Sequence, residues 1–300
     1  MKEIVILSGK GGTGKTSLAA SLAVLADSPT VVVDADVDAA NLHLVLGGRV
    51  VSREPFMGGM EAGIAASRCT ACGECMAHCR FGAIRQEPGG KPQVDPLLCE
   101  GCGVCSLVCP AGAVTLTPAT AGEWLVSETR VGAMFHGALA PGGQNSGKLV
   151  TLLRERARDQ AQAVGAETIV VDGPPGVACP AIASLAGADL AILVTEPSAA
   201  GLHDLERAAQ LCAGFGVRAG IVLNKADLVP ELAAEVTQWA AARQIPMLGS
   251  VPYHPAFNQA QMRGLAVVEN GRGVAAQAII CIWHAALALL GGRNSERRKQ

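Results

Sequence analysis

Residues 4–16 read Ile-Val-Ile-Leu-Ser-Gly-Lys-Gly-Gly-Thr-Gly-Lys-Thr, and this stretch decides the fold. Its first four residues are a continuous apolar run, as expected of a strand that is buried on both faces of a parallel sheet. A glycine-rich turn follows, and then a helical stretch over about residues 15–26. Residues 30–33 are a second apolar run. The order strand, helix, strand predicts a βαβ unit, which requires a parallel sheet.

The turn between the first strand and the helix matches the phosphate-binding pattern G-x-x-x-x-G-K-[S/T] of a Walker A motif. The glycines allow successive N–H groups to surround phosphate oxygens, and the helix N-terminus adds its positive end. Lys15 is placed to neutralise β- and γ-phosphate charge, and the Thr16 hydroxyl to ligate Mg²⁺. The expected nucleotide-binding residues here are Gly9, Lys10, Gly11, Gly12, Thr13, Gly14, Lys15, Thr16 and Ser17.

A second G-x-x-x-x-G-K pattern at residues 142–148 lacks this context. Leu149 stands where Ser or Thr is needed, and no strand clearly precedes the pattern. We interpret it as a loop that caps the helix expected over residues 148–164.

Carboxylates follow two of the predicted strands. Asp34, Asp36 and Asp38 come after the run at 30–33, and Asp172 comes after the run at 169–171. Ligands of open parallel sheets collect outside the carboxyl ends of the strands, where carboxylates hold Mg²⁺ or orient water. Asp36 and Asp172 are therefore predicted to be catalytic with Lys10 and Lys15. For Asp34 and Asp38, a nucleotide role and helix capping both stay open.

Eight of the eleven cysteines fall into two runs of the form C-x-x-C-x-x-C-x-x-x-C, and the runs form an internal repeat. This is the bacterial two-cluster ferredoxin spacing, in which the fourth cysteine of each run ligates the other [4Fe–4S] cluster. Zinc sites need a different spacing. The predicted ligand sets are Cys69, Cys72, Cys75 and Cys109 for one cluster and Cys99, Cys102, Cys105 and Cys79 for the other.

The predicted architecture is a mostly parallel α/β P-loop domain that is interrupted by a small α+β ferredoxin-like domain. We expect the P-loop domain to occupy residues 1–60 and 119–292, the insert residues 61–118, and a flexible tail residues 293–300. Cys212 and Cys281, on helical stretches, are expected to be buried small hydrophobes.

The phosphate loop contains an additional lysine, Lys10, and reads K-G-G-T-G-K-T. Together with Asp34-x-Asp36, Asp172-Gly-Pro-Pro-Gly and Asn224-Lys225-x-Asp227, this deviant Walker A loop resembles the MinD/ParA/nitrogenase iron-protein ATPases of the SIMIBI class. The sequence is most similar to the MinD-superfamily ATPases that carry an inserted ferredoxin domain.

The resemblance implies a role for each matching residue. Lys10 would reach across an ATP-sandwich homodimer, Asp36 would position the hydrolytic water, and Asp172 would support Mg²⁺. Asn224 would bind the adenine, with the region of Pro252 lining the base. Asn224-Lys225-x-Asp227 is also similar to the guanine-reading motif of GTPases, but the deviant loop favours ATP.

Cys179 lies seven residues after Asp172, a spacing similar to that of the iron protein, where a cysteine ligates a cluster that bridges the dimer. No matching second cysteine is evident, so a structural role is favoured.

The net charge of −2 gives no global attraction to nucleic acid or to anionic lipid, so neither is an expected partner. The sequence begins without the features of a signal peptide, and residues 279–290 are too short an apolar run to span a bilayer. Together with the thiols, this predicts a cytoplasmic protein.

Two functions are compatible with these motifs. ATP-dependent dimerisation would gate electron transfer through the clusters to an unknown redox or metal-cofactor protein. Alternatively, ATP would drive a scaffold or carrier for iron–sulfur or metal-cofactor assembly. Retained, redox-cycling clusters would favour the first function, and labile clusters the second.

Overall fold

The computed structural model describes residues 1–26, 29–143 and 145–291. The tail predicted at 293–300 lies outside them. The chain forms two compact units. The first contains residues 1–53, 124–137 and the described chain from 147 onward, and the second contains residues 54–123 and 138–146. The second unit thus begins before the predicted insert and includes a further segment after a hairpin.

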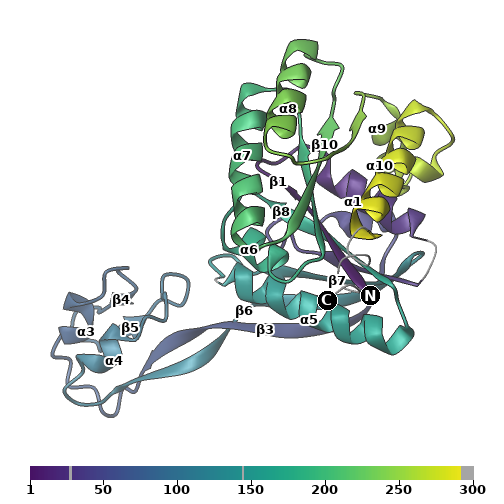
Figure 1. Cartoon of the computed structure of the whole chain (residues 1–300). Helices are drawn as coiled ribbons and strands as arrows, with labels where there is room; N and C mark the ends of the chain where they lie inside the picture. The colour runs from purple at the N-terminus through teal and green to yellow at the C-terminus, as the bar shows by residue number, and fades with distance from the viewer. Residues whose placement is uncertain (27–28, 144, 292–300) are drawn as a thin grey trace, which may run out of the picture. The chain divides into compact units, whose positions relative to one another are not determined.

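The main sheet has nine strands among the described residues, in the order β11-β10-β9-β1-β8-β2-β7-β6-β3 (Figure 1). It confirms the predicted α/β fold with a mostly parallel sheet. The strands are β1 (Lys2–Ser8), β2 (Thr30–Asp34), β3 (Arg49–Ile64), β6 (Val114–Thr129), β7 (Gly132–Leu139), β8 (Thr168–Pro175), β9 (Leu190–Thr195), β10 (Arg218–Asn224) and β11 (Met247–Val251).

Helices cover both faces of the parallel part of this sheet (Figure 1). One face is covered by α1 (Lys15–Leu25), α9 (Ala256–Met262) and α10 (Val274–Gly291), and α2 (Leu42–Leu46) and the short helix η1 (Val267–Glu269) join the same core. The other side carries α5 (Ser146–Val164), α6 (Cys179–Leu185), α7 (Ala199–Gly214) and α8 (Pro230–Ala242). The central strands are buried on both sides, which explains their unbroken apolar runs.

The strand β7 pairs in parallel with β2, and a two-residue turn joins it to β6. Such a short connection makes β6 and β7 an antiparallel hairpin. The strands β3 and β6 each have sixteen residues, and both continue from the first unit into the second.

The second unit contains α3 (Glu74–Ala77), α4 (Val104–Leu107) and a small antiparallel pair, β4 (Ile84–Arg85) and β5 (Gln93–Val94). Its two halves repeat the same backbone. The residues that precede α3 and α4, Gly73 and Gly103, both have φ 81°. Ala71 has φ 57° where the other half has Gly101 with φ 61°. The sequence repeat is therefore also a structural repeat.

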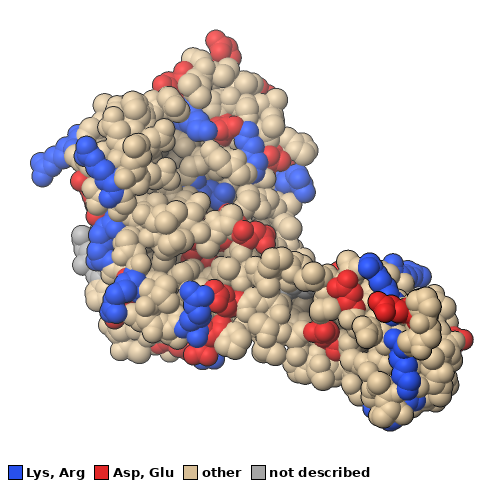
Figure 2. Space-filling view, turned by 180° about the vertical axis from the view of Figure 1, so that it is seen from behind, with Lys and Arg blue, Asp and Glu red and all other residues tan. Residues whose placement is uncertain are grey.

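The last helix, α10, spans Val274–Gly291 and therefore begins before the apolar run at residues 279–290. This helix has eighteen residues and is long and apolar enough to cross a membrane, by length and composition alone. However, Ala275, Ile279, Ile282 and Ala286 form a buried stripe in the core of the first unit. One face of α10 is thus a core face. Acidic and basic side chains are interspersed on the face shown in Figure 2, consistent with the small net charge.

Candidate functional site

The phosphate loop joins the end of β1 to the start of α1, as predicted. Gly12 and Gly14 have φ 77° and 94°, which are conformations that favour glycine. A Cβ on Gly14 would also lie 2.4 Å from the amide nitrogen of Asn224. The Thr13 hydroxyl is buried without a hydrogen-bond partner among the described residues. The loop therefore has the shape of a phosphate site, with an unused polar group inside it.

Two carboxylates lie side by side below this loop. Asp34 and Asp172 are register partners on the neighbouring parallel strands β2 and β8, and both are buried. Burial and the charge of Asp34 raise the pKa of Asp172 to about 8, although the Thr16 and Lys15 side chains act in the opposite direction. Neither carboxylate oxygen of Asp172 has a hydrogen-bond partner in the described chain. A buried carboxylate without a partner beside Thr16 fits a site for Mg²⁺.

Asp34 has a different environment. Its carboxylate accepts hydrogen bonds from the backbone N–H groups of Asp36, Asn41 and Leu42, at 3.2, 2.9 and 2.9 Å. The Asp34 carboxylate therefore holds the backbone of the loop that leads into α2. This is the helix-capping role that the sequence left open for Asp34. Burial raises its pKa to about 7 even though these N–H groups lower it.

Lys15 and Asp36 complete the centre of the site. Lys15 is 7% exposed. Burial lowers its pKa, and the carboxylates of Asp172 and Asp36 act in the opposite direction. Burial raises the pKa of the half-buried Asp36, while Lys15 lowers it. The structure thus places Lys15, Asp36 and Asp172 within electrostatic reach of one another, next to Thr16 and the glycine-rich loop.

The residues expected at the base come from the ends of β10 and β11. Asn224 is the register partner of Val251, which precedes Pro252. The side-chain amide of Asn224 donates to the Thr13 carbonyl at 2.7 Å. Asp227 accepts a hydrogen bond from the N–H of Tyr253 at 2.6 Å. In this structure the side chain of Asn224 therefore binds the phosphate loop, and the side chain of Asp227 binds the segment that follows β11.

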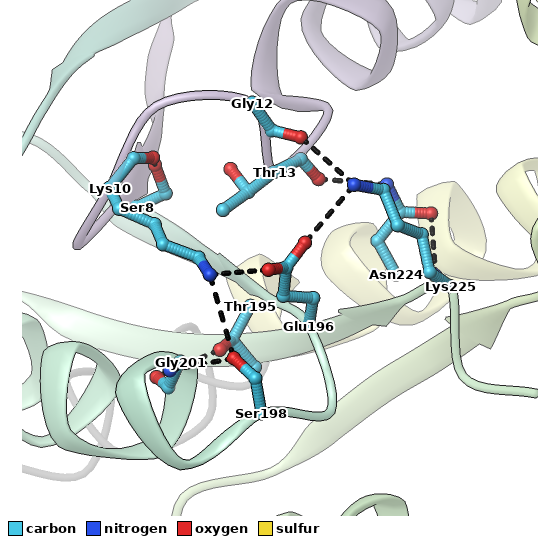
Figure 3. A network of polar contacts seen from close by, with 10 residues as sticks. All are labelled: Ser8, Lys10, Gly12, Thr13, Thr195, Glu196, Ser198, Gly201, Asn224 and Lys225. Atoms are coloured by element: carbon cyan, nitrogen blue, oxygen red, sulfur yellow. Dashed lines mark hydrogen bonds and ion pairs between the residues drawn. The ribbon is translucent and has the colours of Figure 1, made fainter. Parts of the chain in front are cut away.

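Sequence reasoning missed Glu196, which follows the last residue of β9. Its carboxylate forms ion pairs with Lys10 and Lys225 (Figure 3). Burial alone would raise the pKa of Glu196, but hydrogen bonds from these two lysines hold it below its usual range. The signal was available, because Glu196 directly follows a buried strand, just as Asp34 ends one.

Cysteines of both runs line two cavities in the second unit, and each cavity joins three cysteines of one run to the fourth of the other. The sets are Cys69, Cys72, Cys75 and Cys109, and Cys79, Cys99, Cys102 and Cys105. Backbone N–H groups donate to the sulfurs of Cys69 and Cys109, at 3.4 and 3.3 Å. Within the described ranges, no three His, Cys, Asp or Glu side chains are close enough to hold a single metal ion.

The other cysteines lie in the first unit. Cys212 is buried, as predicted, whereas Cys281 is exposed, because it points away from the core face of α10. Cys179 is exposed at the first turn of α6. It lines an open, mostly apolar hollow together with Lys148, Leu152 and Ile182. No second cysteine lines this hollow.

The fold and the loop define a P-loop nucleotide-binding protein of the parallel α/β class. A family model of the CobQ/CobB/MinD/ParA nucleotide binding domain matches residues 4–267. The chain belongs to this family.

Individual relatives support the assignment. An uncharacterised protein of Methanocaldococcus jannaschii is 37% identical over 232 residues, which cover 74% of this chain and 78% of that protein. The septum site-determining protein MinD of Neisseria meningitidis is 25% identical, over 99% of this chain and 93% of its own. The structure of MinD from Pyrococcus horikoshii in complex with Mg-ADP has a TM-score of 0.58 and 20% identity, covering 97% of both chains.

Proposed function

We propose that this protein is an ATPase in which ATP-dependent dimerisation gates electron transfer through two [4Fe–4S] clusters to a protein partner. The proposal is carried by one observation. A single chain has a complete phosphate loop and, in a separate unit, two cavities that are each lined by four cysteines. The family supplies the nucleotide-binding part, and the Mg-ADP complex of the Pyrococcus protein supports a magnesium adenine nucleotide as the ligand.

The residues of the loop have distinct tasks in hydrolysis. Lys15 binds the β- and γ-phosphates, and the unpaired carboxylate of Asp172 and the Thr16 hydroxyl hold Mg²⁺, which supplies charge stabilisation when bound. Asp36 orients a water for in-line attack on the γ-phosphorus. The bond from this phosphorus to the bridging oxygen breaks, and the products are ADP and phosphate. Lys10 adds positive charge from the second subunit, where charge develops in the transition state.

The cysteine cavities fit iron–sulfur clusters better than a single ion. The thiols surround a space rather than converging on one point. N–H donors to cysteine sulfur stabilise thiolates and are among the groups that set a cluster's potential. Since such a set of thiolates needs a reducing compartment, the proposal includes a cytoplasmic location.

Iron counting tests the cluster assignment directly. Protein purified without oxygen should hold about eight iron atoms per chain, as expected for two [4Fe–4S] clusters. Cys72→Ser should lower this to about four, because Cys72 lines only the first cavity. Cys281→Ser is the matched control, since Cys281 is exposed and lines neither cavity, and it should retain the full count. Four or fewer iron atoms in reconstituted wild-type protein, or stoichiometric zinc, would contradict the proposal.

A further inference from the structure

The carboxylate of Glu196 lies between two lysines of the nucleotide site (Figure 3). Lys10, in the phosphate loop, forms an ion pair with Oε1 of Glu196, and its Nζ also lies 3.5 Å from the Ser198 hydroxyl. The Nζ of Lys225 lies 3.0 Å from Oε2 of the same carboxylate. The side chains of Lys10 and Glu196 are only 33% and 20% exposed. In the single chain, the extra lysine of the loop is therefore paired within its own subunit.

Glu196 is held on a rigid frame. The N–H of Ser198 donates to the Glu196 carbonyl at 2.8 Å, and the Ser198 hydroxyl accepts from the N–H of Gly201 at 3.0 Å. The Thr195 hydroxyl donates to the Gly201 carbonyl at 3.0 Å. A Cβ on Gly201 would lie 2.4 Å from the Glu196 carbonyl oxygen, so the turn packs tightly against α7. These contacts fix the backbone at Glu196 between β9 and α7, and the carboxylate itself is held by Lys10 and Lys225.

Lys10 is the partner that is free to leave. Its backbone is anchored, because its carbonyl accepts a hydrogen bond from the Ser8 hydroxyl at 2.6 Å and a Cβ on Gly9 would lie 2.1 Å from Cβ of Asp204. After it, however, a Cβ at Gly11 or Gly12 would meet nothing within 4 Å, so the Lys10 side chain has open space into which it can move. Lys225, by contrast, adopts a left-handed backbone with φ 55°, and its Nζ also donates to the Gly12 carbonyl at 3.2 Å. If Lys10 departs, Glu196 keeps Lys225 as a partner. Release of Lys10 thus leaves no unpaired charge behind, which is the main cost of opening a partly buried ion pair.

We propose that Glu196 is a positioning residue that holds Lys10 back in the single chain and releases it when two nucleotide-bound chains meet. This inference rests on the proposed dimer, in which Lys10 serves the nucleotide of the other subunit. The phosphates of that nucleotide compete with Glu196 for the same ammonium group. The contact therefore raises the concentration of nucleotide-bound chain that is needed for dimerisation.

The contact itself is testable without nucleotide. In Glu196→Gln, Lys10 loses its ion pair but keeps a neighbour of the same size. Acylation of Lys10 by an amine-reactive ester, followed by peptide mass spectrometry, should be about two- to fivefold faster than in wild type, the range expected for a partly exposed pair. Glu206→Gln is the matched control, since Glu206 pairs with Arg243 at 3.0 Å elsewhere on α7. It should leave Lys10 acylation unchanged.

Light scattering with Mg-ATP then tests whether the release of Lys10 favours the dimer. In an Asp36→Ala background that blocks hydrolysis, Glu196→Gln should lower the dimer dissociation constant by about four- to twenty-five-fold, because each dimer releases two such contacts worth about two- to fivefold each. Adding Lys10→Ala should abolish the difference between Glu and Gln at position 196, because Glu196 acts through Lys10.

The outcomes separate this inference from the proposed function. If wild-type protein and both variants stay monomeric with Mg-ATP, the dimer model fails, and the acylation result alone decides whether the contact exists. If Glu196→Gln dimerises no better than wild type, or leaves Lys10 acylation unchanged, Glu196 does not restrain Lys10. A gain that survives Lys10→Ala would likewise overturn the inference.

Discussion

At the scale of single residues, the site contains a buried carboxyl group that has no hydrogen-bond partner in the part of the chain that the structure describes. This group is Asp172, which is 1% exposed and whose two oxygens have no hydrogen-bond partner among the described residues. Such a group costs stability unless a ligand compensates it. The sequence predicted the position of Asp172 from the strand that precedes it. It assigned Asp172 to the nucleotide site and left Asp34 open between a nucleotide role and helix capping, and the structure adds the backbone N–H groups that bind the Asp34 carboxylate.

Asp172→Asn should make the nucleotide-free protein less sensitive to pH. Because its pKa is raised to about 8 from about 4 in the unfolded chain, the folded state binds the extra proton, and stability falls as pH rises through this range. Between pH 6.5 and 8.5, wild type should lose about 2 kcal/mol through this group. Urea unfolding at both values should show a smaller loss in Asp172→Asn. An equal loss would mean that Asp172 is ionised in the folded protein throughout. Asp159→Asn is the control, because Asp159 is exposed, and this variant should lose as much stability as wild type between the two pH values.

Lys15→Ala should reduce ATP hydrolysis by about a hundredfold or more, as expected when a group that stabilises transition-state charge is removed. Iron content should stay at the wild-type value, because the loop and the cysteine cavities belong to different units. Lys148→Ala, in the second G-x-x-x-x-G-K pattern, is the natural control and should hydrolyse ATP normally. Phosphate release and iron assays on the same samples report both results. Normal turnover in Lys15→Ala would refute the assignment of the loop.

At the scale of elements, one buried cation connects three parts of the first unit. Arg154 on α5 is 3% exposed and donates to Glu3 on β1 at 2.5 Å. It also donates to the carbonyl of Ala186, at the end of α6, at 2.9 Å. The helix α6 follows the segment that starts with Asp172. Arg154 thus anchors the far end of this helix, an arrangement that nothing in the sequence pattern indicated.

Glu3→Gln should therefore destabilise the protein by about 3–5 kcal/mol, the range for a buried ion pair that loses one partner. Glu128→Gln removes the partner of Arg49 in an exposed pair at 2.5 Å and should cost less than about 1 kcal/mol. Thermal unfolding of both variants checks the contrast. Equal losses of stability in the two variants would show that burial does not determine how much the pair of Arg154 and Glu3 contributes.

The elements that the sequence predicted well are those with an unbroken apolar run. The strands β1, β2, β8 and β9 are of this kind, because they are buried on both faces. The strand β3 was missed, since its sixteen residues are mostly exposed and include Pro55 and three glycines. Its strand conformation depends on pairing with β6, which lies about sixty residues further along the chain and leaves no local signal.

At the scale of the whole molecule, the α/β fold and the family were predictable from ordered motifs spread over residues 9–227. The boundaries of the second unit were less so. Two of them lie within the long strands β3 and β6, where the composition does not change at residue 54 or 123, and the segment 138–146 gives no sign of belonging to the second unit. The network around Glu196 was also out of reach, because it joins loops that follow β1, β9 and β10 and are far apart in sequence.

In the proposed function, the nucleotide site controls electron transfer from the cysteine-rich unit. The most direct test is the rate at which the chemically reduced protein passes electrons to a one-electron acceptor dye in a stopped-flow instrument. We expect Mg-ATP to change this rate several-fold relative to Mg-ADP in wild type, and we expect no such change in Lys10→Ala with the same iron content. Identical rates with Mg-ATP and Mg-ADP in fully loaded wild-type protein would contradict the proposed function.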